Sequence, residues 1–236
     1  MSYFTPSRRR GIELLDLPDV DPRVVTRSLA DVALANRLFG GARAVVAELE
    51  GVLPALGAAA TLLDVGTGMG DIPARARELA RKRGVRIATT GLDASEALAA
   101  ASRARTGSSV VGDALALPFA DASVDVVVCS QLLHHFVEAD AVTLLAELDR
   151  VARRRVIVAD LRRSWVAAAG IWTASFPLRF HPVSRHDGVV SVLRGFTRAE
   201  LTALVEGGAP GSAARVCRRP GWRLTASWAP RAARAR

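Results

Sequence analysis

The sequence predicts an α/β fold, in which helices cover both faces of a doubly wound and mostly parallel sheet. Three observations lead to this expectation. Short apolar strands alternate with amphipathic helices between residues 61 and 159. The segment 124–129 is almost all valine, as expected for a central strand that is buried on both faces. A glycine-rich turn, residues 66–70, directly follows the first strand, where open α/β sheets bind ligands.

Composition narrows the class of protein. Half of the 236 residues are hydrophobic and 23% are charged, which excludes a disordered or fibrous chain. The formal net charge is +9, yet the arginines are scattered, so we expect a solvated basic surface and no nucleic-acid partner. The two cysteines have no disulfide or metal-ligand spacing, and no metal is expected. Neither a signal peptide nor an integral membrane segment is found, which predicts a cytoplasmic protein.

The N-terminal part precedes the first strand. Residues 1–22 carry prolines among charges and are expected to form an irregular arm. Apolar residues then recur at helical spacing over residues 23–56, and the pair Gly40-Gly41 divides the stretch into two helices. We therefore predict an arm and helical cap over residues 1–58 and a ligand-binding domain over residues 59–236.

The elements of the sheet domain follow in order. Five parallel strands are expected at 61–65, 85–92, 109–112, 124–129 and 155–159, with helices at 71–82, 94–103 and 139–151. Near the C-terminus, Thr197 and Glu200 form a capping box that starts a further helix. Strand-like runs at 214–218 and 222–228 flank the turn Pro220-Gly221 and predict a final hairpin, giving seven strands in all.

An insert at about residues 162–195 interrupts this alternation. Four aromatic side chains in it recur at roughly helical spacing: Trp165, Trp172, Phe176 and Phe180. The favoured interpretation is a face that packs into the core, and the alternative is a lid over an aromatic or lipidic ligand that makes transient contact with a membrane. Residues 185–188 are expected to form a polar turn.

The loop Gly66-Thr67-Gly68-Met69-Gly70 carries the functional argument. Its G-x-G-x-G spacing differs from the G-x-G-x-x-G of dinucleotide-binding folds. Acids also flank it, Asp64 before the loop and Asp71 at the start of the next helix. Asp71 would repel a pyrophosphate at that helix N-terminus. S-adenosylmethionine (SAM) instead brings an ammonium and a sulfonium, which nearby acids favour.

Further polar residues stand at the ends of the following strands. Asp93, in Gly-Leu-Asp, is placed to accept hydrogen bonds from both hydroxyls of a ribose. Asp113, in Gly-Asp-Ala, is placed to accept one from an adenine amino group. Each acid alone would be interpreted as a loop or cap residue, but acids at successive strand ends favour a nucleoside site.

These motifs together resemble the class I SAM-dependent methyltransferase family. The resemblance covers about residues 62–160 through D-V-G-T-G-x-G-D, G-L-D-x-S, G-D-A-x-x-L-P-F and D-V-V-V-x-S-x-x-L-H-H. It is similar in particular to the small-molecule branch that contains quinone-biosynthesis and polyketide-associated enzymes. It implies a Rossmann-like fold with an antiparallel final hairpin, and SAM as the cofactor. The matching cofactor-binding residues are Asp64, Gly66, Thr67, Gly68, Gly70, Asp93, Asp113, Ala114 and Ser130.

The resemblance also bears on the reaction. The loop after the fourth strand faces the transferred methyl in this family, so His134 and His135 are the candidate general bases. The alternative is that one of the two only orders the following helix, and of the two His135 is favoured slightly as the base. The N/D-P-P-Y/F signature of enzymes that methylate exocyclic nitrogens is replaced by Ser130-Gln131-Leu132-Leu133.

We therefore expect O-methylation of a hydrophobic small molecule, such as a phenol, quinol or polyketide-like hydroxyl. C-methylation of a quinone-type ring and an inactive SAM-binding protein are the alternatives, and an NAD-dependent oxidoreductase is a more distant one. The acceptor itself and the oligomeric state are not predicted.

Overall fold

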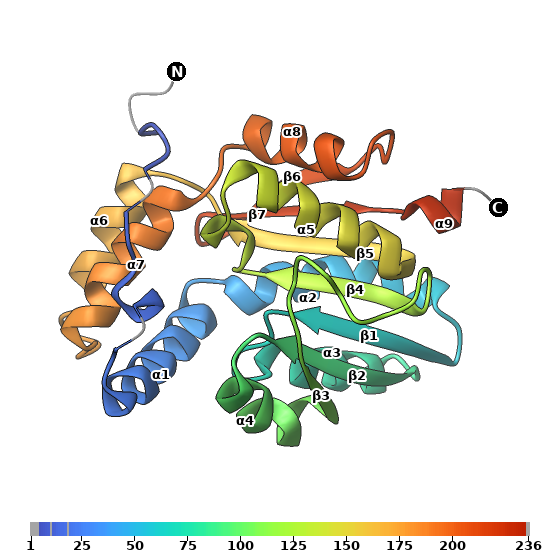
Figure 1. Ribbon diagram of the computed structural model, residues 1–236, viewed down its shortest axis with the longest axis horizontal. Coiled ribbons are helices and arrows are strands. Elements are labelled where there is room, and N and C mark those ends of the chain that lie inside the picture. The colour runs from blue at the N-terminus through green and yellow to red at the C-terminus, as the bar shows by residue number, and fades with distance from the viewer. Residues whose placement is uncertain (1–4, 10, 18, 235–236) are drawn as a thin grey trace.

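The computed structural model describes residues 5–9, 11–17 and 19–234 (Figure 1). The N-terminal part contains a 3-10 turn, η1 (Leu14–Asp16), and the two expected helices, α1 (Pro22–Leu38) and α2 (Gly41–Val52), with a second 3-10 turn, η2 (Leu53–Ala55). Gly40 separates the helices with a φ of 82°. A Cβ atom at Gly40 would lie 2.9 Å from the carbonyl oxygen of Pro220, so glycine also lets the cap approach the C-terminal hairpin closely.

The seven-stranded sheet confirms the predicted fold. Its strands are β1 (Ala59–Val65), β2 (Arg86–Asp93), β3 (Ser108–Val111), β4 (Val124–Ser130), β5 (Ala152–Leu161), β6 (Arg215–Arg219) and β7 (Arg223–Trp228). Their order in the sheet is β3-β2-β1-β4-β5-β7-β6. The first five strands are parallel, whereas β7 runs antiparallel to β5 and to β6. The final hairpin is therefore antiparallel, as expected, and β7 lies between β5 and β6.

Helices cover both faces of this sheet (Figure 1). The remaining elements of the layers are α3 (Asp71–Lys82), α4 (Glu96–Thr106), η3 (Leu133–His135), α5 (Glu138–Val151), α8 (Arg198–Gly208) and α9 (Arg231–Arg234). Successive residues of β1 point to opposite faces: Leu62 packs in the cluster that contains α2 and α3, and Leu63 packs in the cluster that contains α5 and α8. Both leucines are fully buried, which contributes roughly 1.5–3 kcal/mol each.

The insert forms two helices, α6 (Trp165–Ala174) and α7 (Pro182–Arg194), packed against each other at one end of the molecule (Figure 1). The prediction of a polar turn at residues 185–188 is wrong, because these residues lie inside α7. Pro182 starts α7, and a Cβ atom at Gly188 would lie 3.1 Å from Ile171. The glycine that suggested a turn thus allows α6 to pack closely on α7.

The C-terminal elements follow the prediction. The Thr197 side chain accepts a hydrogen bond from the Glu200 amide, and the Glu200 carboxylate accepts one from the Thr197 amide, which completes the capping box of α8. None of the helices described is long and apolar enough to cross a membrane.

Candidate functional site

The site lies at the carboxyl edge of the sheet. The parallel register places Val65, the last residue of β1, beside Leu92 of β2 and Cys129 of β4. The loops that follow these three strands therefore leave the sheet side by side. This is the edge at which open α/β sheets bind ligands.

The glycine loop turns sharply between β1 and α3. Gly66, Gly68 and Gly70 have φ values of 73°, 51° and 74°, a region that glycine adopts without steric cost. The Gly66 and Thr67 amides both donate hydrogen bonds to the Leu92 carbonyl, which fixes the loop to β2. A Cβ atom at Gly68 would meet nothing within 4 Å, so the loop presents open space on that side.

Asp64 is buried beneath the loop with one unsatisfied oxygen. Thr67 donates a hydrogen bond to its Oδ2 at 2.9 Å, while its Oδ1 is buried without a hydrogen-bond partner in the described structure. Burial, followed by the charges of Asp93 and Asp71, raises the pKa of Asp64 to about 7, against the opposing effect of Thr67. A cationic donor beside Oδ1 would satisfy the oxygen and stabilise the ionised carboxylate.

Ser130 provides a second unsatisfied oxygen at the end of β4. Its Oγ is buried and has no hydrogen-bond partner in the part of the chain that the structure describes. Because Val65 pairs with Cys129, Ser130 and Asp64 end neighbouring strands. Two orphaned buried oxygens at adjoining strand ends indicate a place for a ligand with several N–H donors.

Asp93 ties the glycine loop to the end of β2. Its Oδ2 accepts a hydrogen bond from the Gly68 amide at 2.9 Å, and its Oδ1 accepts one from the Ser95 amide at 3.0 Å. Each carboxylate oxygen has a second lone pair, so binding to a ribose remains compatible with these contacts. A Cβ atom at Gly91 would lie 2.7 Å from the Thr67 side chain, which explains the glycine that precedes Leu92 and Asp93.

Asp113 and Ala114 follow β3. Asp113 is exposed, and its Oδ1 accepts a hydrogen bond from the Leu115 amide at 2.8 Å. Ala114 and Leu115 pack against the main hydrophobic core. The loop is therefore ordered by contacts of its own, and the adenine-binding role of these residues stays a prediction.

Asp71 has a partner that the sequence did not predict. It lies at the start of α3, where Arg105 forms an ion pair with it at 2.6 Å. Its charge still contributes to the raised pKa of Asp64. The repulsion of a phosphate by Asp71 therefore stays a prediction, and the buried Asp64 adds a second preference for a cation.

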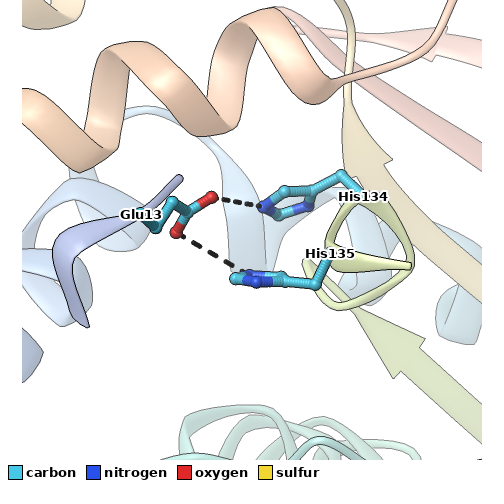
Figure 2. A group of neighbouring side chains, drawn as sticks. All are labelled: Glu13, His134 and His135. Carbon is cyan, nitrogen blue, oxygen red and sulfur yellow. Dashed lines mark ion pairs between the residues drawn. The ribbon is translucent and has the colours of Figure 1, made fainter. Parts of the chain in front are cut away.

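The two histidines lie in η3, after β4, and only His134 is buried (Figure 2). His134 Nδ1 lies 2.7 Å from Asp160 Oδ1, and its amide donates to Asp160 Oδ2 at 3.1 Å. Burial alone would raise the pKa of Asp160, but His134 and the Leu161 amide lower it. Asp160 is therefore ionised and accepts the hydrogen bond, which favours the proton on Nδ1 and the lone pair on Nε2.

His135 is the more exposed of the pair and stacks on His134 at a ring-centroid distance of 4.4 Å. Its Nδ1 lies 3.5 Å from Asp16 Oδ2, and its Nε2 lies 3.9 Å from Glu13 Oε2. Burial would lower the pKa of His135, but Asp16 and Glu13 together raise it. His135 is thus held closer to its protonated form, which weakens the slight preference for it as the base.

The N-terminal arm supplies a residue that the sequence did not predict, Glu13 (Figure 2). Its Oε1 lies 3.8 Å from His134 Nε2 and accepts hydrogen bonds from Ser191 at 2.8 Å and Arg194 at 3.0 Å. Asp187 of α7 accepts hydrogen bonds from the amides of Leu14 and Leu15 and so fixes the arm beside the histidines.

Metal binding can be assessed at this cluster. Ligand atoms of Glu13, His134 and His135 lie within 4.8 Å of one another and could hold a divalent ion. Arg194, however, already neutralises Glu13 and places a positive charge beside it. The contacts of Glu13 are satisfied without a metal.

Asp160 and Glu13, the two acids beside the histidines, differ in whether the sequence signals them. Asp160 ends β5 at the same sheet edge as Asp64 and Asp93, so the rule of acids at strand ends also identifies it. Glu13 lies in an arm with no periodic pattern, and no local signal connects it with residues 134 and 135.

Comparisons with known proteins agree with this geometry. A family model described as "Methyltransferase domain" matches residues 63–159, the segment from β1 to β5. No curated protein sequence matches the chain. Magnesium protoporphyrin IX methyltransferase from Synechocystis PCC 6803, crystallised with bound SAH, is 15% identical with a TM-score of 0.56, over 84% of this chain and 87% of that one.

Two further solved structures share the fold. A SAM-dependent methyltransferase from Aquifex aeolicus is 18% identical with a TM-score of 0.53, over 77% of this chain and 89% of that one. A protein described as a putative O-methyltransferase from Nostoc punctiforme PCC 73102 is 14% identical with a TM-score of 0.54, over 87% and 68% of the respective chains. Residues 63–159 thus match a model of a methyltransferase domain, and the chain shares the fold of these solved methyltransferases.

Proposed function

We propose that this protein is a SAM-dependent methyltransferase that methylates a hydroxyl of a hydrophobic small molecule. The observation that carries the proposal is the pair of unsatisfied buried oxygens, Asp64 Oδ1 and Ser130 Oγ, at adjoining ends of β1 and β4. The family match over residues 63–159 supports the same conclusion. The acceptor class we favour is a phenol, quinol or polyketide-like hydroxyl in secondary or cofactor metabolism.

SAM is the cofactor that these residues fit. Its ammonium offers N–H donors to Asp64 Oδ1 and Ser130 Oγ, which have no hydrogen-bond partner in the described structure. Its positive charge would also stabilise the ionised Asp64 carboxylate. The open side of Gly68 leaves room for the ligand beside the loop. Asp93 is proposed to accept from the ribose hydroxyls, and Asp113 with the Ala114 backbone to bind the adenine.

The chain's own part in the reaction is orientation and proton transfer. When bound, SAM supplies a methyl group that its sulfonium already makes electrophilic. We propose His134 as the base, because Asp160 fixes the proton on Nδ1 and leaves the Nε2 lone pair to take the acceptor's hydroxyl proton. Asp160 then stabilises the imidazolium that forms, since it remains ionised beside it.

Glu13 limits access to that nitrogen. Its carboxylate faces His134 Nε2 at 3.8 Å, so an acceptor hydroxyl must enter between them or displace the arm. The arm and the insert at about residues 162–195 are joined by the Asp187 hydrogen bonds. We therefore propose that the insert and the arm move together as the lid of the acceptor site.

Binding and turnover test separate parts of this proposal. Calorimetry should detect SAM binding to the wild-type chain and strongly weakened binding to Asp64→Asn. An acceptor screen read by mass spectrometry should then give a product one methyl group heavier. SAM binding without any methylated product would leave a SAM-binding protein, and binding of NAD instead of SAM would exclude the proposed function.

A further inference from the structure

Helix α6 lies at the edge of the molecule (Figure 1), and exposed apolar side chains gather on it and just beyond its C-terminal end. Trp165, Val166, Trp172 and Phe176 are exposed by 40%, 46%, 52% and 47%. The expectation that the aromatic face packs into the core is therefore wrong for Trp165, Trp172 and Phe176, and correct only for Phe180, which is 5% exposed. We call the four exposed residues the α6 face.

The packing of the insert does not need these side chains. The inner side of α6 already contacts α7 through a small cluster with Ala168 at its centre and Ala167 and Ile171 beside it. Trp172 and Phe176 contact each other edge to face, with ring centroids 4.9 Å apart. Large apolar side chains that gather on a surface without serving the core indicate an interaction site.

The charge around the α6 face has one sign. Residues 161–186 contain four arginines and no aspartate or glutamate. Arg163 is buried and paired with Glu200, which leaves Arg162, Arg179 and Arg185. The Arg185 guanidinium lies 3.8 Å over the Phe176 ring, and that of Arg9 lies 5.1 Å over the Trp165 ring. The nearby acids point inward: Asp31, which is 4% exposed, accepts hydrogen bonds from the His181 amide and Ser184.

Asp187 is turned inward in the same way. It is also 4% exposed, and both of its oxygens are used by the amides of the N-terminal arm. The surface around α6 therefore combines tryptophan, phenylalanine and arginine with no exposed carboxylate from α6 or from the segment that joins it to α7.

We propose that the α6 face binds the surface of an anionic lipid membrane. Tryptophan side chains favour the boundary between headgroups and acyl chains, and arginines extend their guanidinium groups to phosphates while their stems stay in the apolar layer. The ten residues of α6 span about 15 Å, so the helix lies in the interface and does not cross it. The absence of carboxylates from residues 161–186 is what favours an anionic bilayer over a protein partner.

Vesicle binding tests this inference without reference to methyl transfer. The full chain is sedimented with vesicles of phosphatidylcholine alone and with vesicles of phosphatidylcholine and phosphatidylglycerol in equal amounts. We expect binding to the anionic vesicles that falls with added salt and is much weaker to the neutral ones. The double variant Trp172→Ala/Phe176→Ala should bind at least about ten-fold more weakly, because most of the inserted apolar area is lost.

Matched variants separate a local surface from general charge. Arg179→Gln should weaken binding by about five-fold, while Arg81→Gln, an exposed arginine of α3, should have a smaller effect. Val111→Ala removes part of an equally exposed apolar side chain on β3, an edge strand of the sheet, and should not affect vesicle binding.

Three results would overturn the inference. One is absence of wild-type binding to the anionic vesicles, which needs no variant. Another is an equal loss of vesicle binding in the Trp172→Ala/Phe176→Ala variant and in the Val111→Ala control. The third is a wild-type dimer in solution that the double variant converts to a monomer, which would make the α6 face an interface between copies of the chain.

Discussion

Replacing Asp64 with asparagine should make the ligand-free protein more stable while it weakens cofactor binding. Asp64 has a pKa of about 7 in the folded chain, compared with 3.8 for an ordinary aspartate, because it is buried with a single hydroxyl donor. A folded pKa above the unfolded one means that the stability contribution is full below pH 3.8 and is lost as pH rises through about 7.

The magnitude follows from the difference between these two pKa values. Three pKa units correspond to about 4 kcal/mol, which is the upper limit for the cost of the ionised carboxylate at pH 8. Asparagine preserves the size of the side chain and can still accept the hydrogen bond from Thr67, but it carries no charge. The variant should therefore match the wild type near pH 4 and unfold at higher denaturant concentration than the wild type at pH 8.

Binding should change in the opposite direction. Loss of a charged acceptor for the ammonium should weaken SAM binding by about 1.5–3 kcal/mol, roughly 10- to 150-fold in Kd. Urea unfolding across this pH range and calorimetry with SAM measure the two effects. Asp121→Asn is the matched control, since Asp121 is paired with Arg150 at the surface, does not contribute to the Asp64 pKa shift, and should change neither property much.

The reasoning about Asp64 fails if the Asp64→Asn variant is less stable than the wild type at pH 8. That result would mean that the fold already compensates the charge. Unchanged SAM affinity would separately remove Asp64 from the cofactor site.

Three further predictions concern the same edge of the sheet. For the wild type, SAM affinity should rise as pH increases through about 7, because ionised Asp64 binds the ammonium; the rise should be absent from Asp64→Asn in calorimetry at matched pH values. Asp93→Ala should weaken SAM binding by about 1–3 kcal/mol, and unchanged affinity would exclude the ribose contact. His134→Asn, which can still donate to Asp160, should lower kcat by about 10²–10⁴-fold at unchanged SAM affinity, whereas His135→Asn should have a smaller effect. Full activity of the His134 variant would exclude that residue as the base.

The strands and turns that carry the proposed cofactor residues were predictable because their signals are local. A strand, a glycine turn and a helix occupy consecutive residues, and the acids Asp64 and Asp93 stand where strands end. Parallel strands bring their carboxyl ends to one edge, so the order of the motifs in the chain is sufficient to assemble them. The same rule identifies Asp160, but only the structure shows that Asp160 contacts His134.

The rest of the site depends on tertiary packing that no local pattern records. Glu13 reaches the histidines because Asp187 and Arg194 of α7 hold the arm. Glycine at position 188 indicated a turn when considered alone, but in the structure it allows Ile171 of α6 to pack closely against α7. The aromatic spacing predicted one helical face for Trp165, Trp172, Phe176 and Phe180, but α6 ends at Ala174, so the last two residues lie beyond the helix. Only the packing of α6 against α7 determined which side of the helix faces outward.

Two fully buried aspartates at strand ends of the same sheet edge differ in the direction of their pKa shifts. Burial raises the pKa of Asp64, which receives one hydrogen bond, from Thr67. Asp160 experiences the same burial, yet its pKa is lowered by His134 and by the Leu161 amide. The fold therefore leaves the negative charge of Asp64 without a positive partner, at a place where a cationic cofactor could supply one. It stabilises the charge of Asp160, which can then fix the tautomer of His134. Opposite pKa shifts of this kind would allow one site to give two aspartates the proposed roles, cofactor binding for Asp64 and support of proton transfer for Asp160.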